Sequence, residues 1–208
     1  MVVRPENLVQ HWTVHGSVCR GDEMERGARR HRAGTRNRRR RGDRNSTRTQ
    51  PRGRMTTVGI LSDNHGDWPP HIIESLAGVD AIIHAGDIGP YRLVLDMEAI
   101  APTTAVLGNT DGDMPLDEAA VTTLGGKKFF VQHIVEPHRL QTPLHERLKR
   151  ITPDVVVFGH THQPFYETLG GILFLNPGSV TQPRGDYRPS MVHLTIDNGK
   201  ITPKFIEF

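Results

Sequence analysis

The sequence predicts an α/β fold in which two mixed β-sheets pack face to face, with helices on their outer faces. Two observations support this prediction. Between residues 57 and 111, short apolar runs alternate with helical stretches, a pattern typical of parallel strands joined by right-handed crossovers. From residue 121 onward, pairs of strand-like runs flank Gly-Gly or Asn-Gly dipeptides, which are typical of hairpin turns. The chain of 208 residues is long enough for one sizeable domain.

The first half of the predicted domain alternates strands with helices. The expected elements, in order, are strand 57–61, helix 71–76, strand 79–84, helix 92–100 and strand 103–107. The pair Pro69-Pro70 precedes the first helix, where proline is tolerated. Leu93, Met97 and Ile100 recur at helical spacing in the second helix, and Pro102 ends it.

The second half is expected to form hairpins around one helix and one buried strand. The hairpins are predicted over 121–133, 165–175 and 190–208. Their turns contain Gly125-Gly126, Gly170-Gly171 and Asn198-Gly199. Between the first two hairpins, Leu144 and Leu148 lie four residues apart in a predicted helix over 143–150. The apolar run 154–158 completes the pattern as a buried strand.

The charge of the chain is distributed unevenly. Residues 1–54 hold 15 Arg, no Lys and 5 acidic residues, a net charge of +10. Residues 55–208 hold the other 11 basic and 18 acidic residues, a net charge of −7. The first segment has few periodic apolar positions and cannot bury enough surface to offset its ordering entropy. We therefore expect a disordered extension over 1–54 and a folded domain over 55–208.

Three interpretations of the Arg-rich extension remain open. It could be an arm that binds nucleic acid electrostatically. It could be a transit peptide, although Glu6, Asp22, Glu23 and Glu25 argue against one. It could also result from a mis-assigned start, with Met55 as the true initiator directly before the first strand. We favour the third because a selected basic arm would be expected to use Lys as well as Arg.

Cysteine content and hydropathy indicate the cellular compartment of the protein. The single cysteine, Cys19, excludes an internal disulfide and suits a reducing cytosol. No apolar run approaches the roughly 20 residues that a membrane-spanning helix needs. We therefore predict a cytoplasmic protein with no membrane partner, which could form a homo-oligomer.

Polar side chains able to bind metal follow five of the predicted strands. They are Asp63, His65, Asp87, Asn109, His133, His160 and His162. In open α/β folds, sites form beyond the carboxyl ends of the strands. Residues two apart on extended chain point the same way, so each pair in Asp63-x-His65 and His160-x-His162 should converge. A single Asp or Asn after a strand is more often a cap or a turn residue, but five such strand ends in one domain favour a metal site.

The donor set indicates the metal and its chemistry. Imidazoles mixed with carboxylates suit Mn²⁺, Fe or Zn²⁺ better than Ca²⁺ or Mg²⁺, which favour all-oxygen shells. Seven donors are too many for one ion, so two ions that share a carboxylate are expected. Such ions lie about 3.5–4 Å apart and hold both the attacking and the leaving oxygen of an in-line displacement, and a hydroxide that bridges them is a strong nucleophile at neutral pH.

The same residues carry a resemblance to a known family. The set Asp63-Asn64-His65-Gly66, Gly86-Asp87, Gly108-Asn109-Thr110-Asp111, His133 and Gly159-His160-Thr161-His162 resembles the calcineurin-like metallophosphoesterase superfamily. The short domain and the later Asn176-Pro177-Gly178-Ser179 are similar to its YfcE-like branch. The resemblance covers residues 56–208 and none of the extension.

The resemblance implies a fold, a metal centre and an activity. The fold is a four-layer αββα sandwich of the metal-dependent phosphatase type. The first ion would be held by Asp63, His65, Asp87 and His162, and the second by Asp87, Asn109, His133 and His160. Both ions are expected to be Mn²⁺, with Fe, Zn²⁺ and Ni²⁺ as alternatives. The activity is hydrolysis of a small phosphodiester or phosphomonoester, and a diester is favoured.

Other residues near these motifs have expected roles in catalysis or substrate binding. Asp111 would orient Asn109 or a ligand imidazole. Asn109, Thr110 and the backbone amide of Gly178 would contact the substrate. Thr110 stands where many relatives have His, which acts there as a proton donor; because a Thr hydroxyl has no useful acidity near neutral pH, good leaving groups are expected. Ile134 follows His133 where relatives usually have Gly, so the pocket beside the second metal is expected to be narrower.

Two other functions compete with hydrolysis. A scaffold protein of the same fold, like the retromer subunit that this chain resembles, would need no metal turnover, but such scaffolds have degraded ligands. A nuclease guided by the basic extension would bind nucleic acid through residues 1–54. The acidic domain itself would repel nucleic acid.

Overall fold

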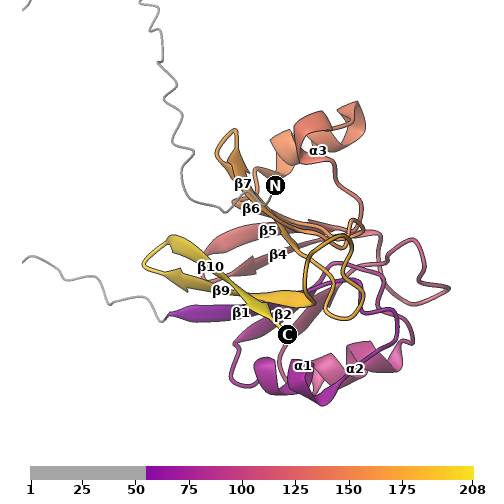
Figure 1. Ribbon diagram of the computed structural model, residues 1–208. Coiled ribbons are helices and arrows are strands. Elements are labelled where there is room, and N and C mark those ends of the chain that lie inside the picture. Colours follow the sequence, from indigo (N-terminus) through magenta and orange to yellow (C-terminus); the bar gives the residue numbers. More distant parts are fainter. Residues whose placement is uncertain (1–54) are drawn as a thin grey trace, which may run out of the picture. The chain divides into compact units, whose positions relative to one another are not determined.

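The computed structural model describes residues 55–208, which form two five-stranded sheets and their flanking helices (Figure 1). The strands are β1 (Thr56–Leu61), β2 (Ala81–His84), β3 (Thr103–Ala105), β4 (Ala119–Leu124), β5 (Lys127–Gln132), β6 (Val155–Val157), β7 (Pro164–Leu169), β8 (Ile172–Pro177), β9 (Ser190–Asp197) and β10 (Lys200–Glu207). The helices are α1 (Pro70–Ser75), α2 (Arg92–Glu98) and α3 (Thr142–Ile151), with a 3₁₀ turn over Pro137–Arg139.

The first sheet combines the amino-terminal strands with the last hairpin. Its order is β10-β9-β1-β2-β3. β1, β2 and β3 are parallel, in a register that places Ile60 beside Ile83 and Ile83 beside Thr104. The final hairpin joins through β9, which runs antiparallel to β1. The carboxyl ends of β1, β2 and β3 therefore lie at one edge of this sheet.

The second sheet is formed by the middle of the chain. Its order is β4-β5-β6-β8-β7. β5, β6 and β8 are parallel, with Val131 beside Val157 and Val157 beside Leu175. β4 and β7 close the two edges as antiparallel hairpin partners. This sheet also gathers the carboxyl ends of its parallel strands at one edge.

Three apolar clusters define four layers. The largest lies between the sheets and contains buried residues of both, among them Val58, Phe129 and Val157. A second joins the outer face of the first sheet to α1 and α2, through residues such as Ile72 and Met97. A third joins the outer face of the second sheet to the loop after β5 and to α3. The predicted αββα fold class is confirmed.

The predicted elements differ from the observed ones mainly at their ends. β2 begins at Ala81 instead of residue 79, and β3 ends at Ala105 instead of residue 107. The 3₁₀ turn was not predicted, because three residues carry no periodic signal. The Arg-rich extension over 1–54 lies outside the described residues, so the predictions about it, including a true start at Met55, remain as stated.

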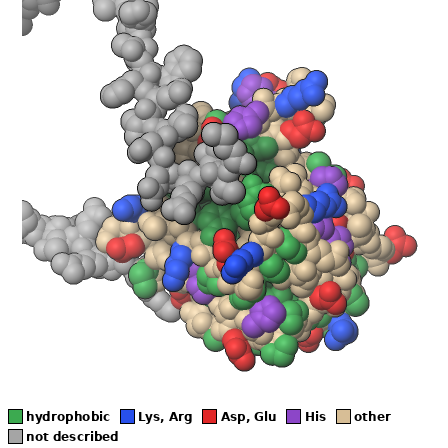
Figure 2. Space-filling view, in the orientation of Figure 1, with side chains coloured by type: hydrophobic (Ala, Val, Ile, Leu, Met, Phe, Trp, Pro, Cys, Tyr) green, Lys and Arg blue, Asp and Glu red, His purple; other side chains and the backbone are tan. Residues whose placement is uncertain are grey.

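The surface and the helices add two facts about residues 55–208. On the face in Figure 2, acidic and basic side chains are interspersed, without a large area of one sign.

None of the described helices combines the length and hydropathy that crossing a membrane requires.

Replacing Phe129 with Ala should strongly destabilise the fold. Phe129 is fully buried between the two sheets, and truncating such a residue costs roughly 3–5 kcal/mol. Urea denaturation should show the loss as a lower midpoint. Tyr166→Ala is the control, because Tyr166 on β7 is 56% exposed. Equal stabilities of the two variants would contradict this account of the core.

Candidate metal centre

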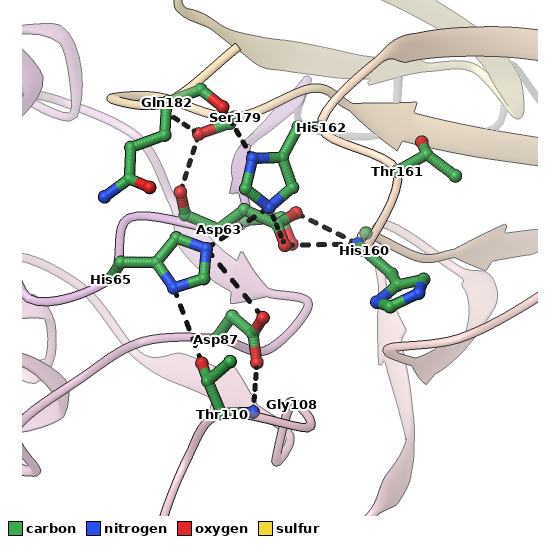
Figure 3. Close-up of polar contacts among 12 residues, drawn as sticks. Asp63, His65, Asp87, Gly108, Thr110, His160, Thr161, His162, Ser179 and Gln182 are labelled. Carbon is green, nitrogen blue, oxygen red and sulfur yellow. Dashed lines mark hydrogen bonds and ion pairs between the residues drawn. The ribbon is translucent and has the colours of Figure 1, made fainter. Parts of the chain in front are cut away.

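The side chains expected to bind metal lie beyond the carboxyl ends of the parallel strands of both sheets, and Figure 3 shows five of them: Asp63, His65, Asp87, His160 and His162. Asp63 and His65 follow β1, Asp87 follows β2, and Asn109 follows β3. These four come from the first sheet. The second sheet supplies the other three: His133 follows β5, and His160 and His162 follow β6. The centre therefore draws on both sheets.

One group of four side chains converges closely. Asp63, His65, Asp87 and His162 each offer a ligand atom, and these atoms all lie within 4.8 Å of one another. His162 Nε2 lies 3.2 Å from His65 Nε2 and 3.4 Å from Asp63 Oδ1. His65 Nε2 lies 3.8 Å from Asp87 Oδ2. Figure 3 shows these side chains pointing toward a common point.

A second group adjoins the first through Asp87. His133 Nε2 lies 3.4 Å from Asp87 Oδ2 and 3.1 Å from Asn109 Oδ1. His160 Nδ1 lies 2.8 Å from the same Asn109 oxygen. The oxygen Asp87 Oδ2 thus faces both His65 and His133. His160 and His162 come from one loop but face different groups.

Two of the imidazoles are oriented by hydrogen bonds at Nδ1, the ring nitrogen that faces away from the site. His133 Nδ1 lies 2.7 Å from the carbonyl of Ala85, and His162 Nδ1 lies 2.5 Å from the carbonyl of Gln182. A carbonyl only accepts, so each Nδ1 carries the proton and each Nε2 presents a lone pair to the site. Lone pairs and carboxylate oxygens therefore meet, and a divalent cation is the partner that such a donor set fits.

The backbone at these ligands adopts an unusual conformation. Seven non-glycine residues among those described have positive φ, and five of them are Asp63, His65, Asp87, His160 and His162, at 47° to 68°. The left-handed region is uncommon for such residues and is found preferentially at functional sites. The premise that each ligand pair lies on extended chain is therefore wrong. The pairs converge through left-handed turns directly after the strands.

Backbone hydrogen bonds hold these turns in place. The Asp63 N–H donates to the carbonyl of Gly86, and the His65 N–H donates to the carbonyl of Asp87, at 3.0 and 2.9 Å. The two loops after β1 and β2 thus continue the pairing of their strands. The His160 N–H donates to both carboxylate oxygens of Asp63, at 3.2 and 3.1 Å. This last contact connects the loops of the two sheets.

The two carboxylates differ in their electrostatic environment. Burial raises the pKa of Asp63, although a hydrogen bond from Ser62 and the imidazoles of His133 and His162 oppose the shift. Burial also acts to raise the pKa of Asp87, but the Thr110 N–H and the nearby His133 outweigh it, so its pKa is lowered. The shared carboxylate is therefore the one held most firmly in its charged form.

Glycines allow the loops to approach these carboxylates. A Cβ built on Gly108 would overlap Asp87 Oδ1 and the Asp87 backbone N. A Cβ on Gly159 would overlap Ser62 Oγ and lie 2.7 Å from Asp63 Oδ2. Glycine at both positions therefore lets the backbone lie close beside the carboxylates.

Several polar residues outside the predicted set support the loops. Asn176 donates from Nδ2 to the carbonyl of Gly159, at 2.8 Å. Ser179 donates to the carbonyl of Asp63, at 2.6 Å, and Thr181 to that of Asn64, at 3.2 Å. The resemblance placed Asn176-Pro177-Gly178-Ser179 near the metal site, with a backbone amide for the substrate, but did not predict that its side chains support the loops. An Asn and a Ser in a turn near a predicted site were the available signal for this role.

Gly178 and Asp111 make hydrogen bonds that the sequence did not predict. The Gly178 N–H donates to Asn176 Oδ1 at 2.9 Å, so this amide has a partner within its own turn. Asp111 accepts hydrogen bonds from the N–H groups of Ile88, Gly89 and Gly108, at 2.8 to 3.0 Å. It therefore fixes the backbone of the loops after β2 and β3, whereas the expectation was that it orients Asn109 or an imidazole.

Thr110 and His84 lie next to the ligands. The Thr110 N–H donates to Asp87 Oδ1 at 2.8 Å, and its hydroxyl lies 3.4 Å from His65 Nδ1. His84 is fully buried; it accepts from the Gly86 N–H and donates to Asn64 Oδ1 at 2.9 Å. Burial lowers the pKa of His84 to about 3. His84 is thus a neutral residue that supports the loops after β1 and β2.

Comparison with known proteins defines the class to which this fold and site belong. The calcineurin-like phosphoesterase superfamily domain matches residues 56–199, and the chain belongs to this superfamily. A probable metallophosphoesterase of Methanothermobacter thermautotrophicus is 31% identical over 157 residues, covering 72% of this chain and 91% of that protein. The phosphodiesterase YfcE of Escherichia coli is 30% identical over 159 residues, covering 63% and 83%.

Solved structures agree with this membership. A predicted phosphoesterase of Streptococcus pneumoniae superposes with a TM-score of 0.61 at 29% identity, over 74% of this chain and 90% of that one. Vacuolar Protein Sorting 29 of Cryptosporidium parvum superposes with a TM-score of 0.60 at 23% identity, over 74% and 98%. The latter likeness shows a shared fold only. The chain is therefore a metal-dependent hydrolase related to phosphodiesterases such as YfcE.

Replacing Gly108 with Ala should disrupt metal binding. The new methyl group would occupy the position of the Asp87 carboxylate, so Asp87 must move away from both groups of ligands. Mn²⁺ binding measured by calorimetry should weaken by at least roughly tenfold. Gly112→Ala is the matched control, because a Cβ there meets nothing within 4 Å. Equal affinities of the two variants would rule out this explanation.

The buried His84 should make the fold sensitive to acid. An unfolded His binds a proton below a pH of about 6.5, whereas His84 in the fold does so only near 3. Between these values the unfolded chain binds more protons, so the free energy of unfolding falls as pH falls, by up to roughly 1.4 kcal/mol per pH unit. Urea unfolding across this window should show a shallower slope for His84→Asn than for the exposed control His145→Asn. Parallel slopes would contradict the prediction.

Proposed function

We propose that the protein is a phosphodiesterase that hydrolyses small phosphodiesters with two divalent ions, Mn²⁺ in the first instance. The observation that supports this most strongly is the pair of adjoining ligand groups that share Asp87 Oδ2. The first group would comprise Asp63, His65, Asp87 and His162. The second would comprise Asp87, Asn109, His133 and His160.

The protein's own residues would hold and orient the reacting groups. When bound, two divalent ions at such a centre neutralise phosphoryl charge and activate water. The chain supplies bare Nε2 atoms on His133 and His162, fixed by carbonyl acceptors behind them. The Thr110 N–H keeps Asp87 oriented between the two groups. Arg184, whose guanidinium lies 3.4 Å from the carbonyl of His160, adds positive charge beside the loop.

The identity of residue 110 bears on the preferred substrate. The Thr110 hydroxyl lies close to His65, but it cannot donate a proton to an alkoxide near neutral pH. We therefore propose that substrates with acidic leaving groups, such as aryl diesters or strained cyclic phosphates, are cleaved fastest.

The alternatives receive less support. A scaffold has no need for seven metal-competent side chains, whereas this chain keeps all seven in two groups. The nuclease hypothesis depends on residues 1–54, outside the described part of the chain. A cytoplasmic location stays a prediction based on the single cysteine, and homo-oligomerisation stays a prediction as well.

Hydrolysis of bis-p-nitrophenyl phosphate should depend on Mn²⁺ and on His133. His133→Ala removes a ligand of the second group, so turnover should fall by about 100-fold or more, beyond the 10–100-fold typical of outer residues. Release of nitrophenoxide measures the rate, with and without a chelator. The control is His138→Ala, because His138 is exposed and pairs with Glu167.

The scaffold hypothesis predicts no Mn²⁺-dependent hydrolysis in this experiment. Hydrolysis that persists in chelator, or that is the same in His133→Ala and the unmodified protein, would refute the proposed function.

A further inference from the structure

A hollow of about 520 Å³ opens beside the second ligand group. Asn109 and His133 line it from the metal centre, and Ile134 and Arg147 line it from the loop after β5 and from α3. Its volume falls within the range of roughly 300–1,000 Å³ typical of small-molecule sites. Whatever ester group extends from a phosphate at the second ligand group toward α3 would enter this hollow.

Arg147 has no ion-pair partner among the described residues. Its guanidinium carbon lies 5.0 Å from the centre of the Phe130 ring, which holds the half-buried side chain in place. Within residues 55–208, Arg147 has no ion pair and no hydrogen-bond acceptor. Lys149 on the same helix does pair, with Glu146 at 2.9 Å. A ring face leaves guanidinium N–H groups available, and these match an oxyanion in geometry.

The other walls of the hollow limit what this oxyanion can be attached to. Ile134 is 46% exposed and presents an apolar surface beside His133. Asp113 and Glu118, both exposed, line the hollow from the segment between β3 and β4. These carboxylates disfavour a large polyanion by repulsion. The combination fits a short carbon chain that ends in a single oxyanion.

We propose that Arg147 is a specificity-determining residue for phosphodiesters in which one ester group ends in a second oxyanion, either a carboxylate or a phosphate. The inference rests on the proposed function, because the reacting phosphate is placed at the metal centre. Ile134 contacts the carbon chain, and the guanidinium of Arg147 binds the oxyanion at its end. Arg147 does not increase the affinity for substrates whose ester groups are neutral or cationic.

Binding of two matched phosphonates tests the proposal without turnover. 3-Phosphonopropionate carries both a phosphonate and a carboxylate, and ethylphosphonate lacks the carboxylate. Calorimetry on the Mn²⁺-loaded full chain should show that the first binds roughly tenfold more tightly, the gain expected of one charge-assisted contact. In Arg147→Gln this preference should disappear. Arg150→Gln, an exposed change on the same helix, should keep it.

A second variant and a diester assay complete the test. Arg147→Glu should bind ethylphosphonate more tightly than 3-phosphonopropionate. The unmodified enzyme should cleave p-nitrophenyl 2-carboxyethyl phosphate faster than p-nitrophenyl phosphocholine, and Arg147→Gln should lose that difference. An unchanged phosphonate preference in both Arg147 variants would overturn the proposal.

The outcomes separate this proposal from the proposed function. Metal-dependent diester hydrolysis, combined with a preference for carboxylate-bearing compounds that does not depend on Arg147, would refute the oxyanion site alone. An Arg147-dependent phosphonate preference without any diester hydrolysis would support the oxyanion site and refute the phosphodiesterase function.

Discussion

The position of the Asp87 carboxylate is the constraint on which the rest of the site depends. Its Oδ2 faces His65 on one side and His133 on the other, while its Oδ1 accepts the Thr110 N–H. Gly108 leaves the space that the carboxylate occupies. One short side chain thus joins the two groups. The Thr110 N–H and His133 lower the pKa of Asp87, so its carboxylate stays anionic.

The packing of the two sheets sets the geometry around that carboxylate. Four of the candidate ligands come from the first sheet and three from the second. The buried cluster between the sheets, which includes Phe129 and Val157, therefore determines how far apart the two sets lie. The contact from the His160 N–H to Asp63 fixes the same distance at the edge. The packing between the sheets therefore also sets the spacing of the side chains that would bind metal.

Sequence patterns were sufficient to predict the layers and to bring the seven candidate side chains to one site, because both follow from local rules. Apolar runs identify buried strands. The residue that follows a parallel strand lies at the edge of the sheet where sites form in α/β folds, and this placement does not depend on distant contacts. Long-range contacts could not be predicted in this way. The roles of Asn176 and Ser179 depend on carbonyls of Gly159 and Asp63, which are distant in sequence. The left-handed conformation of Asp63 or His162 likewise carries no compositional signal, since such residues rarely adopt it.

The place of β9 in the first sheet has a consequence for the order of events during synthesis. β9 pairs with β1, although almost the entire domain separates them in sequence, and Ser179, shortly before β9, supports the Asp63 carbonyl. A growing chain therefore exposes its imidazoles and carboxylates long before the frame that aligns them is complete. Assembly of the centre is in this sense a final step, and a chain that is released early has the ligands but not the site.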